Sequence, residues 1–324
     1  MGTSRAAGRS LARRRVRLSH IDVDNRLTPP IRPGTFPRGV PARSRAVPPF
    51  AMSAFLPLAD AIARLVRPGD AVALEGFTHL IPFAAGHEII RQGVTGLTLI
   101  RMTPDLVYDQ MIGCGCATKL VFSWGGNPGV GSLHRLRDAV EHQWPRPLEI
   151  EEHSHSAMAH AYAAGAAGMP SAFFRGYRGS DLPAVNPRIA FIDDPFTGEP
   201  LAVVPALRPD VTIVHAQKAD RDGNVLVEGI VGVQKEAVLA ARRALVTVEE
   251  VVDTVAKPGG QNAVVLPSWT IDAIAVVPGG ARPSYAHGYY ARDNAFYVAW
   301  DAIARDRDRF RAWIDANVHA AVAR

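Results

Sequence analysis

The fold is decided by one stretch near the start of the patterned part of the chain, Pro68-Gly69-Asp70-Ala71-Val72-Ala73-Leu74-Glu75-Gly76-Phe77-Thr78-His79. Its first three residues have the composition of a turn, and Ala71 to Leu74 is an apolar run short enough for a buried strand. The glycine, aromatic and polar residues that follow are typical of a loop. The stretch therefore predicts a buried strand with a polar loop at its carboxyl end.

Helical and strand patterns alternate around this stretch at a spacing of about 25 residues. Apolar residues at helical spacing predict a helix over 58–66. Further helices are expected from Pro82 over Ile89 and Ile90 and around 235–242, and further strands over 97–100, 120–122, 148–152, 211–214 and 244–248. Such alternation is typical of a parallel sheet covered by helices. We expect a three-layer, Rossmann-like α/β domain with a mainly parallel sheet and a C-terminal helical flank.

One more helix is predicted after Ser132, which is a suitable N-cap residue. Helical spacing would turn its apolar residues, among them Leu136 and Val140, toward the core. The charged residues between them, including Arg135 and Asp138, would then face water.

The positive charge of the chain is concentrated at one end. The formal net charge of +5 would favour a nucleic-acid or acidic partner if it were spread over the surface. Residues 1–50 hold eleven arginines and two aspartates, a net charge of +9, so the remainder carries −4. A mildly acidic body offers no basic surface for a phosphate backbone. Nucleic-acid binding therefore loses its main support.

Residues 1–51 are predicted to form a disordered Arg/Pro-rich extension, followed by one domain over 52–324. The first fifty residues hold seven prolines and lack a sustained apolar period. A secretory signal is disfavoured because no apolar segment follows the arginines. An organelle transit peptide fits the arginines but not the prolines. A start at Met52 fits better, because helical patterning begins just after it.

Cysteine spacing and apolar run lengths bear on the compartment. Cys114 and Cys116 are too close for a favourable disulfide, and no second pair completes a zinc site. We interpret them as reduced thiols, which favours a cytoplasmic protein. No apolar run approaches the roughly eighteen residues of a membrane span, so no membrane association is expected.

Four loops after predicted strands hold residues suited to binding. They are Glu75 to His79, Ser123 to Gly131, Arg175 to Asp181 and His215 to Lys218. In open α/β sheets, ligands bind at the carboxyl ends of the strands. These loops are therefore the candidate positions for a site.

The loop Ser123 to Gly131 superficially resembles a phosphate-binding loop. Gly126 and Gly131 have the Walker A spacing, but Ser132 stands where that motif needs a lysine. Nucleotide hydrolysis is therefore disfavoured. Two interpretations of the glycines stay open: close backbone approach to a ligand, or a tight turn at a domain or subunit contact.

Two other residue patterns bear on metal binding and on hydrolysis. His153 and His155 could share a strand face as metal ligands, but no third ligand stands at a suitable spacing. A polar strand end without a metal is the favoured interpretation. The sequence has no Gly-x-Ser-x-Gly motif, so a serine hydrolase triad is not expected.

Several motifs resemble the A subunits of family I CoA-transferases. Gly69 to Phe77 is similar to their first signature, a Gly-Asp turn leading through an apolar strand to a Gly-Phe loop, although Glu75 stands where glycine is common. Segments 191–196 and 209–217 look like glutaconate-type A subunits, and segments 101–105, 123–135 and 283–289 look like 3-oxoadipate-type A subunits. The resemblance covers residues 55–324.

The resemblance implies an enzyme that moves coenzyme A from succinyl-CoA to a 3-oxo dicarboxylic acid, with 3-oxoadipate of aromatic catabolism as the expected acceptor. In the family, a glutamate carboxylate attacks the donor thioester and then carries CoA as an enzyme thioester. That glutamate lies in a Ser-Glu-Asn-Gly-type motif of a B subunit, and this sequence has no such motif. The resemblance therefore implies a heterotetramer or larger assembly with a separate B subunit. It also implies CoA as substrate and no tightly bound cofactor.

This chain would then supply a wall of the site. The resemblance implies substrate-binding roles for Gly76, Phe77, Thr78, His79, Arg101, Trp124, Gly125, Gly126, Arg175, Arg178 and Gln217. Asn127 would donate a hydrogen bond to an oxyanion. One of the three arginines would pair with the distal carboxylate of the acceptor acid.

Two other functions stay open. A hydrolase of CoA esters or rings on the same fold would use water, and the sequence of the partner chain decides between transfer and hydrolysis. A ligand sensor would need a DNA-binding module, and the Arg-rich segment has no helix-turn-helix pattern.

Overall fold

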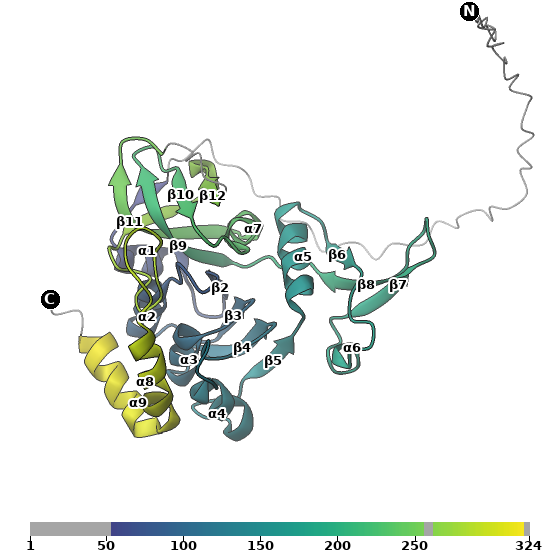
Figure 1. Cartoon of the computed structure of the whole chain (residues 1–324), viewed down its shortest axis with the longest axis horizontal. Coiled ribbons are helices and arrows are strands. Elements are labelled where there is room, and N and C mark those ends of the chain that lie inside the picture. Colours follow the sequence, from purple (N-terminus) through teal and green to yellow (C-terminus); the bar gives the residue numbers. More distant parts are fainter. Residues whose placement is uncertain (1–52, 256–261, 321–324) are drawn as a thin grey trace, which may run out of the picture. The chain divides into compact units, whose positions relative to one another are not determined.

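The computed structural model describes residues 53–255 and 262–320 (Figure 1). The extension predicted over 1–51 lies outside the described residues. Among the helices that are described, none is long and apolar enough to cross a membrane.

The described chain is built on a mainly parallel sheet, as the sequence predicts. Its strand order is β1-β13-β11-β9-β2-β3-β4-β5, and each neighbouring pair on this path is parallel. These strands are β1 (Ala54–Phe55), β2 (Ala71–Glu75), β3 (Leu97–Arg101), β4 (Ala117–Phe122), β5 (Glu149–Glu152), β9 (Val211–Asp220), β11 (Arg243–Val252) and β13 (Ala273–Val276). β10 (Val225–Glu228) turns back antiparallel on β9 and pairs with β12 (Ala263–Leu266).

Helices cover both faces of this sheet, which gives the expected three layers. Val72 and Leu74 point to one face and join a core with the first four helices and the last two. Ala73 points to the other face, where it meets α5 and α7. The helices are α1 (Leu58–Leu65), α2 (Phe83–Arg91), α3 (Leu106–Gly113), α4 (His134–His142), α5 (His155–Ala166), α7 (Gln234–Ala240), α8 (Asn294–Arg305) and α9 (Arg307–Ile314), with short turns at Ser268–Thr270 and Asp315–His319.

A second, smaller sheet was not predicted. It is antiparallel, in the order β6-β8-β7, and consists of β6 (Ser171–Phe174), β8 (Pro200–Pro205) and β7 (Ala190–Asp193), with the short helix α6 (Leu182–Val185) between β6 and β7. Alanines on one side of α5 pack against this sheet, while Met158 and Tyr162 on its other side pack against the main sheet. β6 and β7 have only four residues each, and β8 begins and ends with proline, so none of them stands out as a periodic pattern.

The helix predicted after Ser132 is present as α4, but its cap and its buried face were predicted wrongly. Ser132 does not cap it, because two N–H groups at its start donate to the carboxylate of Asp109 at 2.8 and 2.9 Å. Arg135 and Asp138 are buried and paired at 2.9 Å, whereas Val140 is about half exposed. Arg135 can face inward because Asp138, on the same helix, neutralises its charge and because its guanidinium packs against aromatic rings.

Cys114 and Cys116 lie at the end of α3, and both sulfurs are free, as expected. Burial raises the pKa of both thiols, to about 12 for Cys116. They are therefore inert small apolar groups in this fold.

Candidate active site

The strand order of the main sheet places a binding crevice at one edge. β3, β4 and β5 follow one another on one side of β2, and β9, β11 and β13 follow one another on its other side. The order reverses between β2 and β9, and open α/β sheets bind ligands at such a switch point. The loops after β2, β3 and β4 share this edge with the start of α5. Two of the four predicted loops, Glu75 to His79 and Ser123 to Gly131, are therefore brought together.

The loop after β2 has a fixed and unusual backbone. A Cβ at Gly76 would lie 2.8 Å from the carbonyl oxygen of Leu80, so only glycine fits there. Thr78 and Leu80 adopt left-handed conformations, with φ of 58° and 53°. Phe77 is 37% exposed and Thr78 is also exposed. This strained loop presents an aromatic ring and a hydroxyl to the outside.

His79, predicted to bind substrate, is fully buried in this structure. Its Nε2 accepts a hydrogen bond from the backbone N–H of His287 at 3.1 Å, and its ring lies 4.6 Å from that of Tyr285. Burial lowers the pKa of His79 to about 4, so its imidazole is neutral. His79 therefore anchors the segment 283–289, which resembles 3-oxoadipate-type A subunits, beneath the β2 loop.

Gln217 is likewise an internal anchor, and the loop predicted over 215–218 is part of strand β9. Its side-chain amide donates to the carbonyl of Glu228 at 2.9 Å and accepts from the Glu228 N–H at 3.0 Å. The prediction failed because β9 is longer than its apolar run. β9 continues beyond its apolar run through polar residues, because these residues pair with β11 on one side and, near the hairpin, with β10 on the other.

Arg101 lies beneath the β2 loop. Its guanidinium is 1% exposed, binds the Asp105 carboxylate at 3.1 Å and donates to the Gly76 carbonyl at 2.9 Å. It also lies over the ring of Tyr108 at 5.5 Å. A substrate carboxylate could reach Arg101 only by displacing these partners. The placement argues against the predicted substrate pairing and in favour of a structural role.

Arg175 and Arg178 lie elsewhere, in the loop after β6 of the small sheet. Both pair with Glu199, at 2.8 and 2.9 Å, and both side chains are largely exposed. The structure therefore does not bring the three candidate arginines together. A role of Arg175 or Arg178 in substrate binding stays a prediction.

The glycine-rich loop after β4 holds its glycines for packing reasons. A Cβ at Gly126 would lie 2.6 Å from the indole of Trp124, and one at Gly125 would lie 3.2 Å from Leu136. The Gly126 N–H also donates to the Pro104 carbonyl at 3.2 Å. Trp124 is 45% exposed, so the loop displays its ring at the edge of the sheet.

Asn127, the predicted oxyanion donor, is buried in the same loop. Its side-chain amide donates to the carbonyl of Tyr297 in α8 at 2.7 Å, and its backbone N–H donates to Gly131 at 2.8 Å. The first bond fastens the loop to α8, and the second lies within the loop itself. Donation from Asn127 to an oxyanion stays a prediction, and it requires the bond to Tyr297 to be shared or broken.

A buried carboxyl group joins the ends of β2 and β3. Glu75 Oε1 accepts from the Tyr162 hydroxyl at 2.8 Å and from the Met102 N–H at 3.3 Å. Burial raises the pKa of Glu75, while the charge of Arg101 opposes this shift. The sequence marked Glu75 only as a departure from the family signature. Its partner Tyr162, some ninety residues away, carried no signal of this contact.

Ser123 and His155 form an unpredicted pair at the same edge. Ser123 Oγ donates to the Met102 carbonyl at 2.7 Å and lies 3.1 Å from Nδ1 of His155. His153, the other histidine considered for a metal, lies apart from this pair and contacts Glu151 at 3.0 Å. Within 53–255 and 262–320, no group of three or more His, Cys, Asp or Glu residues could hold a metal ion. Spacing gives one hint, because His155 and Tyr162 are seven residues apart and so share one face of α5.

Comparison with known proteins agrees with this geometry. The family described as Coenzyme A transferase matches residues 56–276. The chain is 67% identical over 267 residues to the A subunit of a 3-oxoadipate CoA-transferase from Pseudomonas knackmussii, covering 82% of this chain and 94% of that one. It is 32% identical over 282 residues to the A subunit of the glutaconate CoA-transferase from Acidaminococcus fermentans, covering 81% and 87%.

The crystal structure of glutaconate coenzyme A-transferase from Acidaminococcus fermentans superposes with a TM-score of 0.77 at 31% identity, covering 83% of this chain and 89% of that one. The sequence match and the structural match both extend over most of each chain. The switch-point edge described above is therefore the edge of a shared fold. The chain belongs to the coenzyme A transferase family.

Proposed function

We propose that this chain is the A subunit of a two-component CoA-transferase that moves coenzyme A from succinyl-CoA to 3-oxoadipate. The observation that carries the proposal is the 67% identity, over 94% of its length, to a relative named for that acceptor. Residues 52–324 would form the A-subunit domain. Coenzyme A enters as part of the substrate, and we place the enzyme in the cytoplasm.

The nucleophile of the transfer comes from a separate B subunit. The sequence has no Ser-Glu-Asn-Gly motif. Glu75, the acidic residue at the end of β2, is 3% exposed, and one of its oxygens already accepts two hydrogen bonds. A carboxylate held in this way cannot attack a thioester at the surface. The reaction therefore needs a glutamate that faces this edge from outside.

This chain would contribute a rigid wall to a site completed by the B subunit. Phe77, Trp124 and Ile230 are each between 37% and 47% exposed. Their loops follow β2, β4 and β10. Exposed aromatic and aliphatic side chains of this kind are typical of surfaces that a partner or ligand covers. We assign the backbone of Gly76 to Thr78 and of Gly125 to Gly126 to the approach of the acyl group.

Co-expression with a B subunit that carries the Ser-Glu-Asn-Gly motif tests the proposal. The purified complex should transfer CoA from succinyl-CoA to 3-oxoadipate, and neither chain should be active by itself. A complex that prefers glutaconate would assign the chain to the glutaconate type. Release of free CoA without an acceptor acid would favour a CoA-ester or ring-opening hydrolase. Lack of association between the two chains would refute the two-component proposal.

A further inference from the structure

The hydrogen bond between Ser123 and His155 has a defined donor and a defined acceptor. A serine hydroxyl carries one hydrogen, and Ser123 Oγ directs it to the Met102 carbonyl at 2.7 Å. The oxygen can then only accept from His155, whose Nδ1 lies 3.1 Å away. Nδ1 therefore carries the hydrogen in the neutral imidazole, and Nε2 presents a lone pair.

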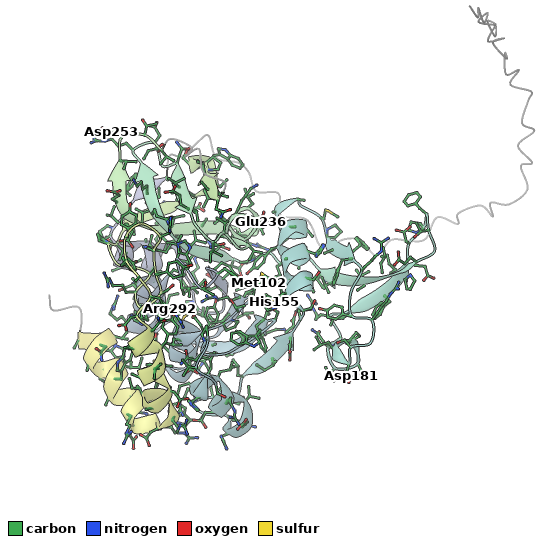
Figure 2. The ribbon with its side chains drawn as sticks, in the orientation of Figure 1. Met102, His155, Asp181, Glu236, Asp253 and Arg292 are labelled. Carbon is green, nitrogen blue, oxygen red and sulfur yellow. The ribbon has the colours of Figure 1, made fainter. Side chains whose placement is uncertain are left out.

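Nε2 of His155 has no hydrogen-bond partner in the described part of the chain, and the residue is exposed. β4 and β5 are parallel neighbours with Phe122 opposite Glu152, so the residues that follow them emerge at one edge. Figure 2 shows Met102 and His155 close to each other there, and both bind Ser123. An open acceptor thus stands at the edge of the candidate active site.

The network behind the pair holds it in place. The Met102 carbonyl also accepts from the N–H groups of Ser123 and Trp124, both at 3.2 Å. The Met102 N–H donates to buried Glu75, and Tyr162 of α5 donates to the same oxygen. His155 is therefore fixed from both sides, through the end of β4 and through its own helix.

We propose that His155 binds the pantetheine arm of coenzyme A, with Nε2 accepting a hydrogen bond from an amide N–H of that arm. This rests on the proposed function. An ionised acceptor acid offers only hydrogen-bond acceptors, so it has nothing to donate to a neutral Nε2. The pantetheine arm carries two amide N–H donors on an otherwise aliphatic chain. Trp124, which follows Ser123 in the chain, is 45% exposed and offers an apolar surface for such a chain.

Ser123 acts as a positioning residue in this arrangement. Its hydroxyl selects the tautomer of His155 and does not touch the ligand. Ser123→Ala would leave the imidazole free to place its hydrogen on either nitrogen. The affinity for coenzyme A should then fall less than it does when the imidazole is removed.

The test measures binding of free coenzyme A to the A/B complex by titration calorimetry. His155→Ala should weaken binding about tenfold, the effect of one lost hydrogen bond. His155→Gln places an amide oxygen near the position of Nε2 and should restore most of the affinity, whereas His155→Asn, whose amide lies near Nδ1, should not. His160→Ala is the matched control. It removes another exposed imidazole of α5, one that stacks on Phe174 at 5.1 Å instead.

Steady-state kinetics supply the second readout. The KM for succinyl-CoA should rise in His155→Ala, while the KM for 3-oxoadipate stays unchanged. Three results would each overturn the proposal. His155→Ala could bind coenzyme A within twofold of wild type, His155→Ala and His160→Ala could lose equal affinity, or the KM for 3-oxoadipate could rise alone. A wild-type complex that binds coenzyme A through His155 but transfers none would refute the proposed function and leave this proposal standing. A complex with no affinity for coenzyme A would refute both.

Discussion

Replacing Arg101 by methionine separates a structural role from a substrate-binding role for this arginine. Arg101→Met keeps an unbranched aliphatic stem but removes the guanidinium that joins the ends of β2 and β3. Arg101 and Asp105 are 1% and 2% exposed as side chains. The substitution therefore leaves a buried carboxylate without its partner, and the Gly76 carbonyl without its donor.

The cost follows from this burial. Breaking a buried ion pair by removing one partner costs about 3–5 kcal/mol, because the remaining charge is uncompensated. We expect the free energy of unfolding to fall by about 4 kcal/mol. The double variant Arg101→Met/Asp105→Leu removes both members of the pair and should recover more than half of that loss.

Urea unfolding of wild type and of both variants, followed by circular dichroism, measures these differences. The KM for the acceptor acid should change little in whatever folded enzyme remains. A single variant that keeps its stability within about 1 kcal/mol of wild type while the acceptor KM rises strongly would refute the structural reasoning. It would return Arg101 to the role that the sequence suggested.

Other substitutions test the loops and the pH dependence. Gly126→Ala places a methyl group 2.6 Å from the far edge of the Trp124 ring. Because this exposed ring can move away, we expect the free energy of unfolding to fall by under about 1 kcal/mol, with a change in tryptophan fluorescence. Burial lowers the pKa of His79 from 6.5 to about 4, so the free energy of unfolding should fall by about 3 kcal/mol as the pH drops through this range. His79→Gln should flatten this part of a stability titration, and an unchanged slope would contradict the assignment. Arg175→Gln and Arg178→Gln remove exposed pairs and should each cost under about 1 kcal/mol, so a raised acceptor KM in either would point to a substrate role.

The architecture of the main sheet could be predicted because it rests on local pattern. The strand around Val72 is an apolar run bounded by turn residues, and such a run has few alternatives in an α/β chain. The small sheet gave no such signal. Its strand around Ile192 is exposed along its length, and its pairing depends on residues brought close only by the fold.

The face of a helix or loop was harder to predict than its position. Arg135 was expected in water because charge normally stays there, yet it is buried with Asp138 as its counter-ion. The sequence cannot show that two charged residues one helical turn apart will be covered by C-terminal helices more than a hundred residues away. The pair becomes buried only when the C-terminal helices pack over it.

Three of the predicted site residues are buried, and their substrate-binding roles stay predictions. The sequence places these polar residues, Arg101, His79 and Gln217, at or near strand ends, where ligands bind, but all three side chains turn inward. A loop with left-handed residues leaves backbone groups unpaired, and buried side chains must satisfy them. A polar residue after a parallel strand is therefore as apt to hold the loop as to bind a substrate. The sequence pattern does not predict the direction of such a side chain, because side chains alternate between the two faces only within the strand.

The groups that face outward at this edge include the rings of Phe77, Trp124 and His155. Their backbone is held by the buried side chains beneath it. Such a surface loses little conformational entropy when a second chain or a ligand covers it, because its loops are ordered beforehand. The same rigidity is what a site needs if its backbone donors are to stabilise an oxyanion without rearranging. On this reasoning the buried polar network beneath the β2 loop would contribute to catalysis by making the loop rigid. The nucleophile would come from the B subunit.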